Sequence, residues 1–163
     1  MSYNYRPATV DDLDEIVNIM DLVIKEHILH YPDQFKLETK EKSNNIWLEY
    51  INDSFRFYHY LEVCEHNNKI VGLLAGKMAI TENVKYRIDN KLFYLEWIAV
   101  HPDYRNNKIA SGFGHNMEKW AKNNNIDQII AEVWEFNNSC KGLYEYNGYK
   151  LNRFGIDKKI NNE

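Results

Sequence analysis

The sequence predicts an α/β domain in which helices cover both faces of a mixed central sheet. Two observations support this prediction. First, two runs with strand character, 60–65 and 70–79, are joined by a short polar turn and are therefore expected to form an antiparallel hairpin. Second, an apolar strand over 92–100, an amphipathic helix over 109–121 and a strand over 126–134 follow in the order of a crossover, which makes these two strands parallel. With 163 residues, the chain is expected to form one domain over 1–163.

The charge and the cysteine content restrict the partners and the compartment. A formal net charge of −4 and an isoelectric point near 5.9 argue against nucleic acid or a membrane surface as the main partner, so a small partner is expected. Cys64 and Cys140 lie far apart and lack the spacing of a zinc site or a redox pair, which indicates a reduced, cytoplasmic protein. His27 and His30 lack further ligands, so no metal is expected.

The first third of the chain is expected to be helical. Thr9 and Asp12 have the spacing of a capping pair, whose side-chain oxygens satisfy free backbone donors at the start of a helix. The residues that then recur at helical spacing, and are expected to face the core, are Leu13, Ile16, Val17, Met20 and Ile24. A shorter helix is predicted around Trp47 and Ile51.

The second half of the chain carries the clearest pattern. The near-continuous hydrophobicity of 92–100 is typical of a central strand that is covered on both faces. Apolar residues line one face of the next helix, and the run Asn123-Asn124-Asn125 is expected to end it. A short helix over 139–147 and a final strand region over 149–160 complete the predicted elements.

The loop 105–110 connects the central strand directly to the crossover helix. Ligands of open α/β sheets bind at the carboxyl ends of parallel strands. There, the free N–H groups and the positive dipole end of a helix favour a pyrophosphate. Arg105 and Lys108 would add positive charge. The alternative is an ordinary polar connection between a strand and a helix.

Asn137 and Tyr144 lie seven residues apart, which is nearly two helical turns. This spacing places both on one helix face, about 10 Å apart along the axis. A tyrosine phenol with an ordinary pKa of about 10 stays protonated at neutral pH and can donate its proton to a leaving thiolate. The alternative is that Tyr144 only packs, as one of 12 tyrosines in the chain.

Three short motifs follow one another between residues 95 and 149. A strand ends in Val100-His101-Pro102, a loop reads Arg105-Asn106-Asn107-Lys108-Ile109-Ala110, and a helix carries Asn137, Cys140 and Tyr144 before Gly148-Tyr149. These motifs resemble the acetyl-coenzyme A (acetyl-CoA) binding core of the GCN5-related N-acetyltransferase (GNAT) superfamily. The corresponding patterns there are V-x-P, R/Q-x-x-G-x-G/A and N-x-x-A-x-x-x-Y, followed by G-F or G-Y.

The resemblance implies a fold, a reaction and a set of residues. It implies two splayed parallel strands that hold acetyl-CoA, the co-substrate, in the gap between them. It also implies an acyltransferase that passes the acetyl group directly to a primary amine of a small molecule or a protein. Tyr144 would protonate the leaving thiolate, and a backbone N–H within 98–100 would polarise the thioester carbonyl. The residues expected to bind acetyl-CoA are Ile98, Ala99, Val100, Arg105, Asn106, Asn107, Lys108, Ile109, Ala110, Ser111, Asn137 and Tyr144.

Lys108 departs from the loop pattern, because it takes the place of the central glycine. A glycine lets the backbone approach a phosphate and adopt unusual dihedral angles. Lys108 is therefore expected either to keep an ordinary conformation with its side chain turned outward, or to fold back and pair with a phosphate. Asn106 tolerates a left-handed conformation. Slightly weakened binding of the co-substrate is expected.

Two acids are candidates for the base that accepts the proton of the amine. Glu96 lies in an apolar strand, where an unpaired carboxylate is costly. Glu132, on the neighbouring predicted strand, resembles the glutamate that serves as base in some acetyltransferases of the superfamily. We rank Glu96 first. The alternative for each is an acid that is paired with a basic or tyrosine side chain, or one that lies on an exposed strand face.

The sequence leaves the acceptor open. The first helices and the connection 81–91 are expected to shape its pocket, and similar proteins make a homodimer a further expectation. A second class of function is a module of the same fold that binds acyl-CoA for sensing without transferring the acyl group.

Overall fold

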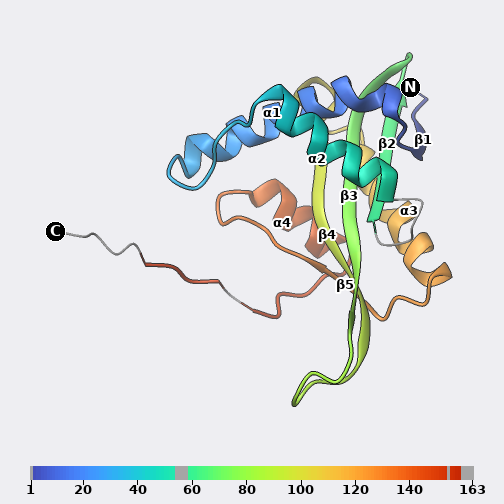
Figure 1. Ribbon diagram of the computed structural model, residues 1–163, viewed down its shortest axis with the longest axis vertical. Helices are drawn as coiled ribbons and strands as arrows, with labels where there is room; N and C mark the ends of the chain where they lie inside the picture. The colour runs from blue at the N-terminus through green and yellow to red at the C-terminus, as the bar shows by residue number, and fades with distance from the viewer. Residues whose placement is uncertain (1, 54–58, 154, 159–163) are drawn as a thin grey trace.

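The computed structural model describes residues 2–53, 59–153 and 155–158, and within them one mixed sheet is flanked by helices (Figure 1). The strands are β1 (Asn4–Pro7), β2 (His59–His66), β3 (Lys69–Thr81), β4 (Asn90–Val100) and β5 (Gln128–Ala131), and the helices are α1 (Leu13–His30), α2 (Lys40–Asp53), α3 (Ile109–Asn123) and α4 (Asn138–Tyr146). The strand order is β1-β2-β3-β4-β5, and among the described residues β4 and β5 are the one pair of parallel neighbours. The predicted fold class, hairpin and crossover are confirmed.

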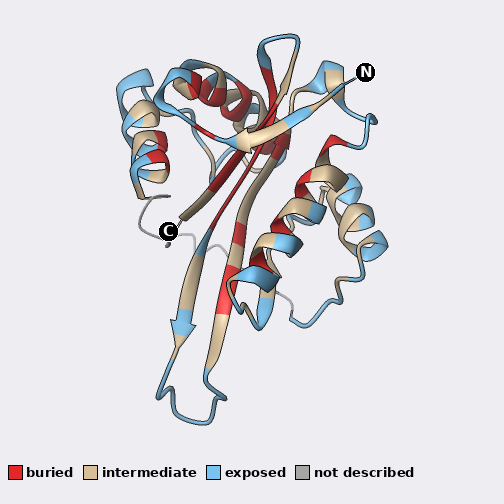
Figure 2. Cartoon of the chain, turned by 90° about the vertical axis from the view of Figure 1, so that its right-hand side faces the viewer, coloured by how far each residue is buried: buried red, intermediate tan, exposed pale blue. Residues whose placement is uncertain are grey.

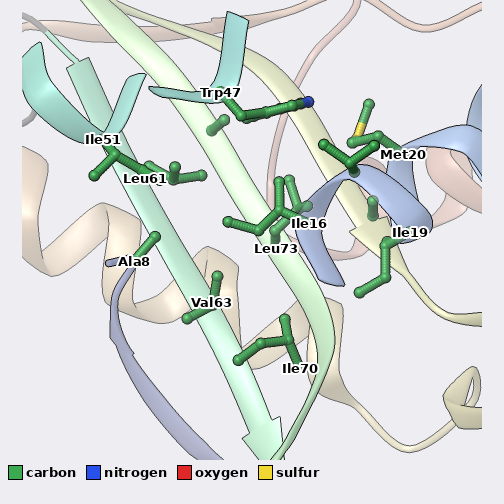
Figure 3. Close-up of a cluster of buried hydrophobic side chains, with 13 residues drawn as sticks. Ala8, Ile16, Ile19, Met20, Trp47, Ile51, Leu61, Val63, Ile70 and Leu73 are labelled. Atoms are coloured by element: carbon green, nitrogen blue, oxygen red, sulfur yellow. The ribbon is translucent and has the colours of Figure 1, made fainter. Parts of the chain in front are cut away.

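Helices α1 and α2 pack on one face of the sheet through a single hydrophobic cluster (Figure 3). Ile16 of α1, Trp47 of α2 and Leu73 of β3 are all buried in it. The predicted capping pair is confirmed, because the backbone N–H of Thr9 donates to Asp12 at 2.8 Å. It opens a short 3-10 turn that continues into α1.

Helix α3 packs on the opposite face and is held there by β1. Figure 2 shows the buried residues of the helices on the sides that face the sheet. The hydroxyl of Tyr5 donates to the carbonyl of Ile109 at 3.1 Å, and its ring lies edge-on to Phe113. A Cβ atom at Gly112 would overlap the Tyr5 hydroxyl. A glycine at this position therefore permits the close approach that fixes the first turn of α3.

Strand β4 contains a bulge where its pairing with β5 ends. Ala75 lies opposite Trp97 and Gly76 opposite Leu95, so Glu96 is the extra residue. The parallel pairing of β4 with β5 stops at Leu95. A bulge bends a strand and increases its twist, which accounts for the divergence of the two strands from this point onward. The structure therefore has the splayed parallel strands of the predicted fold.

One predicted strand is shorter than expected. The strand expected over 126–134 comprises only 128–131, because the chain then leaves the sheet and packs its aromatic side chains near the end of α1. Trp134 lies 4.9 Å from Tyr31 and Phe136 lies 4.1 Å from His30, measured between ring centroids.

The final strand expected over 149–160 is absent from the described residues 149–153 and 155–158. Its exposed apolar residues Leu151 and Ile156 cover no face of the sheet, so burial does not favour a strand there. Positions 154, 159 and 160 lie outside the described residues.

The connection between β3 and β4 projects beyond the body of the molecule (Figure 2). Residues 82–89 form its tip, and about 16 Å of strand separates Asn90 from Leu95, where the strands diverge. That the first helices and 81–91 shape the pocket of the acceptor stays a prediction. None of the helices in the described part of the chain has the length and apolar composition needed to cross a bilayer.

Candidate active site between the diverging strands

The edge of β4 that faces β5 lacks a strand partner, among the described residues, beyond Leu95. The N–H of His101 donates to Val71 at 2.9 Å, so His101 faces the β3 side. Because successive strand residues alternate in direction, the amide of Ala99 also faces β3, whereas those of Ile98 and Val100 face the gap. A contact of Arg105 supports this assignment. Its Nε donates to the carbonyl of Val100 at 3.2 Å, and the carbonyl and amide of a strand residue point to the same side.

Of the three predicted strand residues, the structure therefore brings two to the gap and not the third. Ile98 and Val100 present their amides there. Ala99 turns its amide toward β3 and buries its side chain in the cluster under α1 and α2.

Lys108 adopts a left-handed backbone conformation, which a glycine adopts without strain. Its φ is 61° and its ψ is 16°, in the left-handed region, and Asn106 has a φ of 65°. Of the two alternatives for Lys108, the one with an ordinary backbone conformation is thus wrong, and Asn106 adopts the left-handed conformation that an asparagine tolerates. The reason is local: the chain must turn into α3 while the Lys108 carbonyl accepts from the N–H of Gly112 at 3.0 Å. The side chain of Lys108 is exposed.

The first turn of α3 directs backbone donors out of the helix. The N–H groups of Ile109, Ala110 and Ser111 precede the N–H of Gly112, which closes the first turn onto Lys108, so the helix offers them no carbonyl. The positive end of the helix dipole adds to them. These three residues, all predicted to bind the co-substrate, therefore form one set of donors at the start of the helix.

Two loop residues that were expected to meet the pyrophosphate already have partners. Arg105 pairs with Glu26 of α1 at 2.7 Å, in addition to its contact with Val100. The side-chain amide of Asn107 donates to the carbonyls of Tyr104 and Arg105, each at 3.1 Å. Asn107 therefore holds the loop in shape, and Arg105 joins the loop to α1.

A narrow apolar pocket lies between α3, α4 and β4. The residues that line it include Leu95 and Ile98 of β4, Ala110, Gly114 and Met117 of α3, and Leu143 and Tyr144 of α4. The pocket begins beside the first turn of α3 and extends along the helix.

Tyr144 is one of the polar residues that line this pocket, together with Glu118, Asn147 and Tyr149. It packs in the hydrophobic cluster beneath α3, with its ring centroid 5.0 Å from that of Tyr149. Burial, and then the neighbouring Cys140, raise the pKa of the Tyr144 phenol above its ordinary value. Tyr144 is therefore a protonated donor throughout the physiological pH range.

Asn137 is the N-cap of α4. Its Oδ1 accepts from the backbone N–H of Cys140 at 3.0 Å, and its carbonyl accepts from Lys141. The side-chain oxygen thus satisfies a free donor at the helix start and fixes where α4 begins. By setting the helix start, Asn137 also sets the position of Tyr144 seven residues later.

Glu96 lies on the face of the sheet opposite Tyr144. Its Oε1 pairs with Lys77 of β3, and its Oε2 accepts from the hydroxyl of Tyr50 on α2. Burial, followed by this contact with Glu96, raises the pKa of Tyr50. The alternative of an acid paired with a basic or tyrosine side chain therefore describes Glu96, which has both partners.

Glu132 is exposed and follows the last residue of β5, so the prediction that it lies on a strand is wrong. The parallel register places Leu95 beside Ala131. Glu96 and Glu132 each come next in sequence, and both therefore lie at the point where the strands begin to diverge.

Sequence reasoning missed Tyr50, Lys77 and Tyr5. A signal existed for Lys77, because it is the only charged residue in 70–79, and Glu96 is the only one in 92–100. Single opposite charges in neighbouring apolar strands predict a cross-strand pair. Tyr50 and Tyr5 gave no comparable signal, because each reaches its partner across a large sequence separation.

A model of the acetyltransferase (GNAT) family matches residues 18–149. No curated protein is significantly similar to the chain. Among solved structures, a mutant of the BH1408 protein from Bacillus halodurans is 17% identical with a TM-score of 0.85, over 96% of this chain and 99% of that one.

Two further structures are similar in fold. A predicted acetyltransferase from Clostridium acetobutylicum with acetyl-CoA is 17% identical with a TM-score of 0.72, over 97% of this chain and 96% of that one. The aminoglycoside N-acetyltransferase AAC(6')-Iy in complex with CoA is 11% identical with a TM-score of 0.75, over 98% of this chain and 95% of that one. The family match spans the segment from α1 through α4. The chain therefore belongs to the acetyltransferase (GNAT) family, the enzyme class that its motifs predict.

Proposed function

We propose that the protein uses acetyl-CoA as co-substrate and transfers the acetyl group directly to a primary amine. The observation that carries this proposal is the unpaired edge of β4, with the amides of Ile98 and Val100 on it, Tyr144 on one face of the sheet and Glu96 on the other. Two of the similar structures contain acetyl-CoA or CoA, which supports the choice of co-substrate.

The donor set at the start of α3 fits a pyrophosphate. Its N–H groups are those of Ile109, Ala110 and Ser111, and the left-handed backbone at Lys108 keeps the geometry that a glycine would provide. The exposed Lys108 side chain adds a positive charge beside them. The proposed path of the pantetheine arm runs along α3 beside the narrow pocket, with Asn137 setting where α4 begins.

Three groups of this chain can act on the thioester end of acetyl-CoA: the amides of Ile98 and Val100 and the phenol of Tyr144. Acetyl-CoA supplies a thioester whose carbonyl carbon is the electrophile. The amides of Ile98 and Val100 are fixed donors for the carbonyl oxygen, which gains negative charge during the attack. Tyr144 is a protonated donor for the departing sulfur, which has a free pKa of about 8.5.

The amine must lose a proton before or during the attack. An aliphatic amine with a pKa of about 10.4 carries a deprotonation cost of about 4.6 kcal/mol at pH 7. Glu96 is our first candidate for the base, because it lies at the divergence point on the face opposite Tyr144. Glu132 is the alternative, since it lies at the same level on the neighbouring chain segment.

Binding and transfer test this function separately. We expect calorimetry to show saturable binding of acetyl-CoA, and a panel of primary amines to show release of CoA with an acetylated product. No saturable binding at millimolar acetyl-CoA would overturn the proposal. Binding without transfer or hydrolysis would instead identify the module that only senses acyl-CoA.

Glutamine substitutions distinguish the two bases. With the best amine of the panel, E96Q is expected to lower kcat by about 100-fold at pH 7 and to lose the rise of the rate with pH. E132Q, which removes the carboxylate of the other candidate, is measured beside E96Q under the same conditions. An unchanged rate for E96Q together with a large loss for E132Q would assign the role to Glu132. A cytoplasmic location and a homodimer stay predictions from the sequence.

A further inference from the structure

Glu96 is held by two side chains that differ in how firmly they are fixed. The ring of Tyr50 packs against Trp47 at 5.2 Å and against His59 at 4.8 Å, measured between ring centroids. The Lys77 side chain is 49% exposed, whereas that of Glu96 is 23% exposed. Tyr50 therefore belongs to the packed part of the structure, and Lys77 is the partner that can exchange for water.

The Lys77 side chain is itself an aliphatic primary amine. Four methylene groups lead to its ammonium group, which lies on Oε1 of Glu96. An acceptor whose proton Glu96 removes must bring the same chemical group to the same carboxylate. Since the Tyr50 hydroxyl occupies Oε2, a second ammonium at Oε1 would meet the like charge of Lys77. The acceptor and Lys77 therefore compete for one position.

We infer that Lys77 occupies, in the acceptor-free protein, the subsite for the ammonium group of the acceptor, and that acceptors are aliphatic primary amines that displace it. This inference rests on the proposed function and names the substrate class of the same site. Glu96 and Tyr50 form the fixed part of the subsite. Lys77 determines how much amine is needed to fill it.

The charges around the pair favour such an exchange. An ion pair with one half-exposed partner contributes little to stability, so Lys77 can leave at small cost. Glu96 and Lys77 are the only charged residues in 92–100 and 70–79. Without Lys77, the carboxylate therefore lacks a cationic partner from these two strands, which favours the binding of an external cation.

The test measures amine binding without the coenzyme. n-Pentylamine is titrated at pH 7, and the indole signal of Trp97, next to Glu96 in β4, is followed by NMR. We expect K77M to bind pentylamine about tenfold more tightly than the wild type, because the competing charge is gone and the apolar stem is kept. K77R keeps the charge and should restore wild-type binding, whereas E96Q should lose binding.

Two controls make the test specific. K69M removes an exposed lysine at the other end of β3 and should leave pentylamine binding unchanged. n-Pentanol has the same aliphatic chain without the charge, and it should bind no variant more tightly than it binds the wild type. Should K77M lose its fold by circular dichroism, K77Q provides the same comparison.

The inference is overturned if neutral variants at Lys77 bind pentylamine no more tightly than the wild type, or if E96Q binds it as well as the wild type does. In the transferring enzyme, K77M should lower KM for pentylamine about tenfold with kcat within about twofold. Failure of the proposed function has a different signature, namely no binding of acetyl-CoA and no acetylated amine, whatever the pentylamine titration shows.

Discussion

Glu96 and Tyr144 lie on opposite faces of the sheet, at the gap between β4 and β5. Glu96 contacts Tyr50 of α2, whereas Tyr144 packs in the cluster beneath α3. A carboxylate and a phenol arranged in this way can serve two reactants that meet in the gap from opposite sides. The bulge at Glu96 and the end of the pairing at Leu95 produce this arrangement.

Removal of the Tyr144 hydroxyl should slow the transfer and leave binding intact. We expect Y144F to bind acetyl-CoA within about twofold of the wild type and to lose about 100-fold in kcat, the usual size of a lost proton donor. The control is Y146F, on the same helix, whose ring is 86% exposed. Equal turnover of Y144F and the wild type would refute the acid role.

A glycine at position 108 should stabilise the protein. A side chain in the left-handed region costs about 1 kcal/mol, and glycine removes this cost. K108G is therefore expected to melt about 2–4 °C above the wild type. K108A keeps the strain and should melt no higher than the wild type. If K108A gained as much as K108G, the removal of the lysine charge would be the cause instead.

Two glycines of α3 should respond in opposite ways to alanine. At Gly112 the new methyl group would overlap the Tyr5 hydroxyl, so G112A is expected to lose about 2 kcal/mol of stability. At Gly114 no atom beyond the adjoining residues and the backbone of the same helix lies within 4 Å of the new methyl group, and G114A should gain up to about 1 kcal/mol from helix propensity. Urea unfolding measures both. A stable G112A would show that β1 does not fix the start of α3.

Stability should fall as the pH rises through the titration of Glu62. Burial raises the pKa of Glu62 to about 7, and the hydrogen bond from Asn116 at 3.0 Å does not offset it. Between pH 4.5 and 7, the folded state therefore holds a proton that the unfolded state has lost, so the free energy of unfolding decreases with rising pH.

Replacement of Glu62 by glutamine removes the charge and keeps the partner of Asn116. E62Q should match the wild type near pH 4.5 and exceed it at pH 8, by up to about 3 kcal/mol in guanidinium unfolding. E82Q, at the exposed tip between β3 and β4, is the matched control. A wild-type difference between pH 5 and pH 8 that persists in E62Q would contradict this assignment.

Local patterns in the sequence were sufficient for much of the fold. The hairpin, the first turn of α1 at Thr9 and Asp12, and the crossover through α3 depend on periodicity and capping within short segments. The end of β5 was not predictable in this way. The run 126–134 was expected to be a strand throughout, but the chain leaves the sheet after residue 131, where the pairing with the bulged β4 ends and Trp134 packs on Tyr31.

The features of the candidate site also differ in whether the sequence or the tertiary structure determines them. The sequence by itself determined the family, the loop that leads into α3 and the spacing between Asn137 and Tyr144, because these are properties of neighbouring residues. The single charges in 70–79 and 92–100 indicate a pair of Lys77 with Glu96, but only the tertiary structure decided that Tyr50 also holds Glu96 and on which face Glu96 lies. The physical reason is that a bulge and a cross-strand contact depend on register between distant segments, which no local spacing specifies.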